Sequence, residues 1–301
     1  MALSTDEIEA IQGVSKVSRP TSIADHLRRN MDLMTPSERK IARTLLSSYP
    51  AVGLSSVADL AQHSSSSPAS VIRLVQKLGF GGFLEFQGAL LEELTVRRAG
   101  PKDRLERSPN HSNFEAAISP LAKGMAETIT SITETIPESE FSAAIETLCD
   151  LSKRVWLIGG RSSRSWAMLL ENYLLRLRPE VALLSNDLNS RSAAIIDASK
   201  KSVLVAFDVR RYELDTVHVV KAFKERHAKV LLITDVLLSP AANYADIVLP
   251  INVEVPAPFD TAVAGIALVE MLTSAVLSGL GNYGVQRMNL WEESTARGLT
   301  D

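Results

Sequence analysis

The sequence predicts an all-α N-terminal domain joined to an α/β C-terminal domain with a five-stranded doubly wound parallel sheet flanked by helices. Three observations support this fold class. Short helical patterns with marked ends fill the first hundred residues, a charged stretch with helix breakers follows, and β-branched apolar runs then alternate with helical stretches. With 301 residues, of which 46% are hydrophobic and 22% charged, the chain is long enough for two separate cores.

The first two helices of the N-terminal domain are marked by capping residues. Thr35-Pro36-Ser37-Glu38 has the spacing of a capping box with proline at the first helical position, and Ser56 is placed to cap residues 57–62. A serine-rich turn at residues 63–66 then leads to a third helix. The spacing predicts three short helices with a tight turn between the last two.

The third helix has both ends marked. Ser67 suits the N-cap, Pro68 the first helical position, and Gly79 can end the helix in the left-handed conformation. Its apolar residues fall on one face and its polar residues largely on the other. A solvated surface helix would show the same pattern, but the two preceding helices complete a helix-turn-helix arrangement that is typical of DNA binding.

The charge distribution permits nucleic-acid binding without establishing it. The formal net charge is −3, yet residues 1–110 carry 14 Lys and Arg against 12 Asp and Glu. Between residues 35 and 82 the excess is larger, with five basic side chains against Glu38 and Asp59. Such a local excess suits a dimeric DNA-binding protein, because a dimer doubles the number of phosphate contacts.

From about Arg28 to Leu94 the sequence resembles the N-terminal domain of RpiR-type bacterial transcriptional regulators. The resemblance rests on the Thr35 capping box, on Val57 to Ala61, on Ser67 to Lys77 and above all on the run from Leu78 to Phe86, LGFGGFLEF. It implies binding to double-stranded operator DNA. The residues that we expect near phosphates or base edges are Ser37, Ser66, Ser67, Ser70, Arg73, Gln76 and Lys77.

We expect a flexible tail over residues 1–21, the helix-turn-helix domain over 22–98, a linker over 99–113 and the second domain over 114–301. Cys149 is the only cysteine, which excludes an intrachain disulfide and a cysteine-based zinc site. The N-terminus lacks a signal pattern and no apolar run reaches the length of a membrane span. We therefore expect a cytoplasmic protein without a membrane partner.

The second domain is predicted to begin with helices over about 114–136 and 137–151, after which five strands follow. Continuous apolar strands separated by helices indicate a parallel sheet covered on both faces. In such sheets ligands bind beyond the carboxyl ends of the strands. The strands are expected at residues 155–158, 181–184, 203–207, 230–233 and 247–249.

Two loops at these strand ends are candidates for binding an anion. Gly159 to Arg164 combines glycines, which allow close backbone approach, with hydroxyl groups at a helix start. In the loop from Asp208 to Thr216, Arg210 and Arg211 can offer planar contacts to phosphate or carboxylate, and Asp208 can orient one of them. A tight strand-to-helix turn without a ligand and an ordinary surface loop are the alternatives.

From about Phe114 to Gly281 the chain resembles a SIS (sugar isomerase) domain. That family commonly binds a phosphosugar through Gly-x-Gly-x-Ser and Ser-x-Ser-Gly-x-Thr-x-Asp-Thr loops. Here Ser163, Asp215 and Thr216 match, whereas Arg161 replaces a glycine and charged residues replace most of the second loop's hydroxyls. The expected effector-binding residues are Gly160, Arg161, Ser162, Ser163, Asp208, Arg210, Arg211, Tyr212 and Thr216.

Two further segments belong with these loops: Thr234 to Pro240, and Pro256 to Thr261. The second precedes a long apolar helix, predicted over Ala262 to Leu280, whose sides are both expected to be buried in helix packing inside the chain or between subunits. Glu270 within that helix is a weak candidate for proton transfer. The five histidines lack metal-ligand spacing, and no nucleophile elbow or P-loop is present.

The sequence thus predicts a regulator that is not an enzyme and has no catalytic set, metal or cofactor. It would form a homodimer or tetramer, bind a palindromic operator and sense a small anionic metabolite such as a phosphosugar or sugar acid, controlling carbohydrate or related metabolic genes. A phosphosugar isomerase with an accessory N-terminal module and a SIS dimerisation scaffold without ligand are the alternatives.

Overall fold

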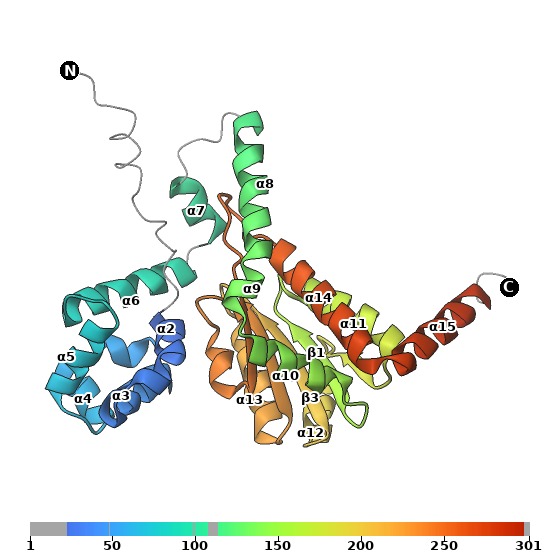
Figure 1. Ribbon diagram of the computed structural model, residues 1–301, viewed down its shortest axis with the longest axis horizontal. Coiled ribbons are helices and arrows are strands. Elements are labelled where there is room, and N and C mark those ends of the chain that lie inside the picture. The colour runs from blue at the N-terminus through green and yellow to red at the C-terminus, as the bar shows by residue number, and fades with distance from the viewer. Residues whose placement is uncertain (1–22, 48, 99, 108–113, 298–301) are drawn as a thin grey trace.

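The computed structural model describes residues 23–47, 49–98, 100–107 and 114–297. The predicted tail, residues 1–21, lies outside them. A helical N-terminal region is followed by an α/β C-terminal region (Figure 1). The predicted fold class is therefore confirmed, while the predicted domain boundaries stay a prediction.

Capping interactions define the helices of the N-terminal region. At the capping box the Thr35 N–H donates to Glu38 Oε2 at 2.9 Å, and the Glu38 N–H donates to Thr35 Oγ1 at 3.3 Å. Ser56 and Ser67 cap the next two long helices, and Gly79 adopts a φ of 94° after the last of them. The elements are α2 (Ile23–Arg29), η1 (Met31–Leu33), α3 (Pro36–Ser47), η2 (Ala51–Leu54), α4 (Val57–His63), α5 (Pro68–Lys77) and α6 (Phe83–Arg98).

One hydrophobic core holds these helices together. Val71, Leu74 and Val75 on the apolar face of α5 are fully buried in it, together with side chains from α2, α3, α4 and α6. Phe86 of α6 closes the core and packs edge-on against Phe80 at a ring separation of 5.5 Å. The core therefore fixes which face of α5 points to solvent.

The segment between the two regions differs from its prediction. The expected linker contains a helix, α7 (Pro101–Arg107), whose start is capped because the Gly100 N–H donates to Asp103 Oδ2 at 2.8 Å. The helix expected over 114–136 is divided into α8 (Phe114–Thr130) and α9 (Ile132–Thr135), followed by α10 (Glu138–Cys149). At the division, Ser131 Oγ donates to the Thr128 carbonyl, and such side-chain bonds to the backbone bend helices.

The C-terminal region contains the predicted five parallel strands in the order β2-β1-β3-β4-β5. Neighbouring β1 and β3 pair so that Gly159 lies opposite Phe207 at their carboxyl ends. The strands are β1 (Arg154–Gly159), β2 (Val181–Leu183), β3 (Ser202–Asp208), β4 (Lys229–Asp235) and β5 (Ile247–Ile251). The other elements are α11 (Arg164–Leu177), α12 (Leu188–Asp197), α13 (Leu214–Glu225), η3 (Pro240–Tyr244), α14 (Val263–Leu280) and α15 (Asn282–Arg297).

Helices cover both faces of the sheet. Val203 and Val205 of β3 point into a core shared with α10, α11 and α14, whereas Leu204 and Ala206 point into a second core shared with α12 and α13. Alternate side chains of a buried parallel strand serve opposite layers in this way. The loops after β1 and β3 consequently meet at one edge of a rigid sheet.

The apolar helix α14 is buried on one side only. Leu268, Val269 and Leu272 lie in the core, whereas Ile266 and Met271 are more than one-third exposed in the single chain, so the expectation that both sides are buried, inside the chain or between subunits, stays a prediction. By length and composition α14 could cross a membrane, so the expectation that no apolar run reaches that length is wrong. Its buried side packs against α8, α10, α11 and α15. Glu270 is exposed.

Candidate functional site

The solvent face of α5 is a candidate nucleic-acid interface. Ala69, Arg73 and Gln76, spaced four and three residues apart, form an exposed stripe on the side opposite the core. Ser67 is also exposed and its hydroxyl accepts the Ser70 N–H at 3.2 Å. The expected residues Ser67, Arg73 and Gln76 are therefore accessible to a large ligand.

Two of the expected serines serve the local fold. Ser70 is only 5% exposed, and its hydroxyl bonds to Ser67 Oγ at 2.9 Å and accepts from the Arg73 guanidinium at 3.0 Å. Ser70 thus positions Arg73 instead of facing solvent, which corrects its expected place on the polar face. Ser66 is half-buried and bonds to the buried Ser64 hydroxyl at 2.7 Å, which fastens the turn before α5.

Lys77 and Ser37 lie at the border between α5 and α3. Lys77 is exposed, but its ammonium donates to the Leu33 carbonyl at 2.8 Å and pairs with Glu38 at 3.2 Å. The backbone N–H of Thr35, together with Lys77, lowers the pKa of Glu38 below its ordinary value, so this carboxylate stays charged and retains the lysine. Ser37 is half-buried at the second position of α3.

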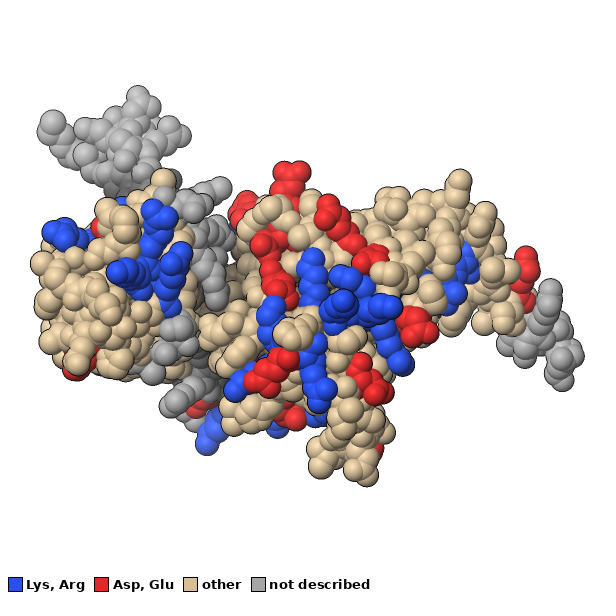
Figure 2. Space-filling model, turned by 90° about the horizontal axis from the view of Figure 1, so that it is seen from below, with Lys and Arg blue, Asp and Glu red and all other residues tan. Residues whose placement is uncertain are grey.

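The two regions differ in surface charge. On the face seen in Figure 2, Lys and Arg side chains gather on the N-terminal domain with few Asp or Glu side chains beside them, whereas both signs are interleaved on the C-terminal domain. The exposed basic side chains of the N-terminal region include Lys40, Arg43, Arg73 and Lys77. This distribution suits a polyanion at the N-terminal domain.

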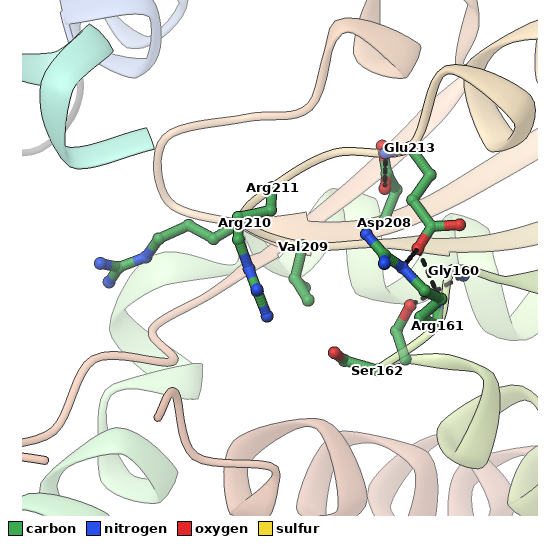
Figure 3. Close-up of a pocket in the computed structure, with 9 residues that line it drawn as sticks. Gly160, Arg161, Ser162, Asp208, Val209, Arg210, Arg211 and Glu213 are labelled. Atoms are coloured by element: carbon green, nitrogen blue, oxygen red, sulfur yellow. Dashed lines mark hydrogen bonds and ion pairs between the residues drawn. The ribbon is translucent and has the colours of Figure 1, made fainter. Parts of the chain in front are cut away.

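A first cleft lies where the loops after β1 and β3 meet. It encloses about 290 Å³, part of it open to solvent. Figure 3 shows the Gly160–Ser162 loop on one side and the Asp208–Glu213 loop on the other. The lining residues are Gly160, Arg161, Ser162, Ser163, Asp208, Val209, Arg210, Arg211 and Glu213. Seven of the nine expected effector residues are therefore together in this cleft.

Ser163 and Glu213 tie the two loops together. The buried Ser163 hydroxyl donates to the Phe207 carbonyl at 2.7 Å and accepts the Gly160 N–H at 3.1 Å. Glu213 Oε1 accepts from the Arg161 backbone N–H at 2.8 Å and from its guanidinium at 3.0 Å. The hydroxyl proton of Ser163 is thus committed to the backbone, whereas Ser162 remains exposed.

Asp208 is a buried acid with a high pKa. Burial is the main cause that raises the pKa of this carboxyl to about 7, against hydrogen bonds from Ser239 Oγ and from the Glu213 N–H that lower it. The expectation that Asp208 orients an arginine is wrong among the described contacts. Its two oxygens are taken by Ser239 and by the backbone of its own loop, so Asp208 fixes the loop.

The arginine pair is divided between two environments. Arg210 is buried, its Nη2 donates to Glu254 at 3.2 Å, and its Nε lies 3.6 Å from Asp260 Oδ1. Arg211 is exposed, adopts a φ of 64°, and forms no hydrogen bond or ion pair within the described part of the chain. Arg211 is therefore available to an anion, whereas Arg210 already has two carboxylate partners.

Arg104 of α7 joins the same charge cluster. Its Nη1 donates to Asp260 Oδ1 at 2.6 Å, and its Nη2 lies 4.0 Å from Glu254 Oε1. The cluster of Arg104, Arg210, Glu254 and Asp260 borders a second, wider cleft of about 570 Å³, partly open to solvent. Trp166, Arg211 and Phe259 also line it. A helix from between the two regions thus forms part of the wall.

The remaining expected residues lie outside both clefts. The Tyr212 hydroxyl donates to Asp235 Oδ1 at 3.0 Å, and Thr216 is buried in the first turns of α13. Of the two further predicted segments, Pro256 to Thr261 lines the wider cleft with its residues 258–261, whereas Thr234 to Pro240 lines neither cleft. Arg104, Trp166 and Glu254 were not identified, because no spacing signal connects them to the two loops. No cluster of potential metal ligands occurs among the described residues.

Comparisons with protein families agree with this architecture. The rpiR-family helix-turn-helix domain matches residues 21–96, and the SIS domain matches residues 151–275. An HTH-type transcriptional regulator of Haemophilus influenzae is 28% identical over 217 residues, which are 72% of this chain and 75% of that protein. One of Thermotoga maritima is 28% identical over 234 residues, 76% of this chain and 81% of that protein.

Two solved structures share the fold. The sugar isomerase domain of an RpiR transcription factor from Sphaerobacter thermophilus superposes with a TM-score of 0.55 at 20% identity, covering 58% of this chain and 98% of that one. The Vibrio vulnificus NanR protein, complexed with ManNAc-6P, superposes with a TM-score of 0.54 at 17% identity, covering 92% of this chain and 99% of that one. The second likeness extends over both regions.

Proposed function

The chain belongs to the RpiR-type family of helix-turn-helix transcriptional regulators with a SIS domain, and from this premise we propose that a small anionic metabolite bound in its SIS domain controls operator binding by α5. The observation that carries this proposal is the meeting of the Gly160–Ser162 and Asp208–Glu213 loops beside the exposed Arg211. The metabolite class is a phosphosugar or sugar acid, and the chain acts in the cytoplasm as a regulator and not as an isomerase.

We propose that the exposed stripe of α5 reads the operator. Arg73 can donate two hydrogen bonds to guanine and Gln76 can pair with adenine in the major groove. The contact between Ser70 and Arg73 supports this role because it restricts the guanidinium before DNA binds. Lys77, Ser67 and Ser37 are placed to contact phosphates beside the recognition stripe.

The ligand proposal is supported by the chemistry of the clefts. Arg211 offers a guanidinium to an acid group, and Ser162 presents an exposed side chain with a hydroxyl group near the start of α11. The NanR protein in its complex with ManNAc-6P supplies a phosphosugar precedent on the same fold. Tyr212 and Thr216 would act behind the loop and not on the ligand.

Coupling to DNA is proposed to run through α7. Arg104 is held by the same two carboxylates that hold Arg210, so an anion that draws Arg210 toward itself leaves these carboxylates to Arg104 and strengthens the hold on α7. Because α7 follows α6 of the DNA-binding domain, a firmer hold on α7 restricts how that domain is placed. The effect is reciprocal, so operator DNA changes effector affinity by the same factor.

A homodimer or tetramer is part of the proposal. Two copies of α5 would read the two halves of a palindromic operator. Exposed apolar side chains on one C-terminal helix layer support self-association because water is excluded when they pair. They are Met168 of α11, Ile266 and Met271 of α14, and Tyr283, Val285 and Leu290 of α15.

Isothermal titration calorimetry tests the ligand proposal. ManNAc-6P, arabinose 5-phosphate and a panel of sugar acids are titrated into the full chain and into its Arg211→Gln variant, with Lys200→Ala as the control at the opposite end of β3. We expect binding by the wild type and about 10-fold weaker binding by Arg211→Gln, since a charge-assisted hydrogen bond is lost. No binding by any probe would instead favour a dimerisation scaffold.

A further inference from the structure

Two residues that line the wider cleft each carry a buried hydrogen-bond donor without an acceptor in the part of the chain that the structure describes. The donors are the indole Nε1 of Trp166 and the Nε of Arg210, and both side chains are at least nine-tenths buried. Both residues line the cleft of about 570 Å³. Buried donors are almost always paired, so two unpaired donors in residues that line one cleft call for an explanation.

The packing of Trp166 prevents the ring from turning to find an acceptor. Its six-membered ring lies against Gly265 of α14 so closely that a Cβ at that glycine would stand 2.3 Å from the indole. On another side the ring packs edge-on against Phe207 of β3, with 6.3 Å between ring centroids. The glycine thus makes room for the tryptophan, and the indole N–H is held in a fixed position.

Arg210 is held equally firmly. Its Nη2 donates to Glu254, and its Nε stands 3.6 Å from Asp260 Oδ1, which is close enough for an ion pair but too long for a hydrogen bond. The side chain is 5% exposed, so free exchange with bulk water does not compensate the Nε–H. The guanidinium is charge-neutralised, while its Nε donor has no acceptor among the described residues.

The cleft has the composition of a small-ligand site. Aromatic walls with a few convergent polar groups are typical of such sites. Phe259 and Trp166 supply the aromatic surface, while Arg211 and Ser162 lie on the boundary shared with the first cleft. One molecule can therefore extend from the first cleft into the second.

We propose that this cleft is a subsite for a carbonyl or carboxylate oxygen of the effector, which accepts from Trp166 Nε1 and Arg210 Nε. The effector would then be an anion with an acid group at Arg211 and a second oxygen acceptor, such as an N-acyl aminosugar phosphate or a phosphorylated sugar acid. This inference rests on the proposed function and makes Trp166 a specificity-determining residue that rejects analogues without the acceptor.

Nuclear magnetic resonance of the full chain with 15N-labelled tryptophan tests the subsite. The three tryptophans, Trp156, Trp166 and Trp291, give three indole signals, and Trp166→Phe assigns the one of interest. The probes are ManNAc-6P and 6-phosphogluconate, with mannosamine 6-phosphate and sorbitol 6-phosphate as matched analogues that lack the carbonyl or carboxylate. Trp156, which stacks under the Arg154 guanidinium at 4.1 Å, is the internal control.

The expected result is a downfield shift of the Trp166 indole proton with at least one acceptor-bearing probe and not with its matched analogue. Calorimetry of the same pairs should show a preference for that probe of roughly 3- to 10-fold, the worth of one hydrogen bond. Trp166→Phe should abolish the preference while leaving binding of the analogue intact, provided that its thermal unfolding remains cooperative.

Three outcomes contradict the subsite. In the first, the Trp166 signal stays in place with both acceptor-bearing probes, and in the second it moves equally with both members of each pair. If calorimetry registers binding in either case, the subsite is wrong and the proposed effector binding stands. In the third outcome none of the four probes gives heat, so the proposed effector binding fails and the subsite fails with it.

Discussion

The polar face of α5 and the clefts of the SIS domain present their arginines in opposite ways. Arg73 stands exposed on α5 and donates a hydrogen bond to a neighbouring serine, whereas the side chain of Arg210 is 5% exposed and faces two carboxylates. The first arrangement is open to any polyanion. The second admits only a ligand that offsets the loss of existing partners.

This difference matches the demands of the two partners. DNA is a large polyanion whose affinity comes mainly from the release of counterions, so exposed charge suffices and base contacts add selectivity. A small metabolite cannot gain enough free energy from charge in water, because exposed ion pairs contribute little. It needs a partly desolvated site, where polar groups are worth more and wrong ligands leave donors unpaired.

A large expected effect on stability concerns the buried acid of the cleft. Because the pKa of Asp208 is raised to about 7 from 3.8, its stabilising contribution is fully present below about pH 4 and is lost as the pH rises through 7. The loss amounts to at most about 4 kcal/mol. Urea denaturation between pH 4 and 8 should therefore show the stability of the wild type falling relative to Asp208→Asn. Parallel pH profiles would contradict the raised pKa.

In α5, the substitution with a comparable effect on stability lies on the buried face of the helix. Leu74→Ala should lower the free energy of unfolding by about 2–5 kcal/mol, since Leu74 is fully buried in the N-terminal core. Chemical denaturation followed by circular dichroism measures the loss. Arg73→Ala serves as the control, for its side chain lies in solvent and its removal should leave stability nearly unchanged. Similar losses in the two variants would mean that the faces of α5 are assigned wrongly.

Substitutions on the exposed face of α5 are expected to change the affinity for operator DNA and not the stability of the fold. Arg73→Ala should weaken binding by about 1–3 kcal/mol if Arg73 reads a base, on the operator selected from random-sequence DNA. Ser70→Ala should weaken binding less, because it only frees the Arg73 guanidinium. Gel shifts at fixed salt provide the measurement, with Lys200→Ala as the control. An unchanged affinity of Arg73→Ala would remove it from the interface.

The two sites also differ in how far the sequence could predict them. The ends and faces of α5 follow from signals that act within a few residues: Ser67 as cap, Pro68 at the first position and Gly79 at the end. The expected loops after β1 and β3 could also be predicted, because apolar runs identify the strands of a parallel sheet and the carboxyl ends of such strands lie at one edge. Within α5, Ser70 departed from its expected place because its short side chain folds back onto Ser67 and Arg73.

The charge cluster of the wider cleft could not be predicted in this way. Arg104 and Asp260 lie 156 residues apart, and Arg210 and Glu254 lie 44 apart, without a periodic pattern that relates them. The high pKa of Asp208 and the buried indole donor of Trp166 likewise depend on burial by distant segments. Tertiary packing therefore determines what the cleft can bind, although local sequence determines where the cleft is.

The most direct test of the central claim is the response of operator affinity to ligand in the full chain and in its Arg104→Ala variant. ManNAc-6P, or whichever probe binds by calorimetry, is added to gel shifts with the selected operator, and Lys123→Ala on α8 is the control. Wild type and control should change operator affinity on ligand binding, whereas Arg104→Ala should still bind ligand but respond several-fold less. An equal response in Arg104→Ala would contradict coupling through α7.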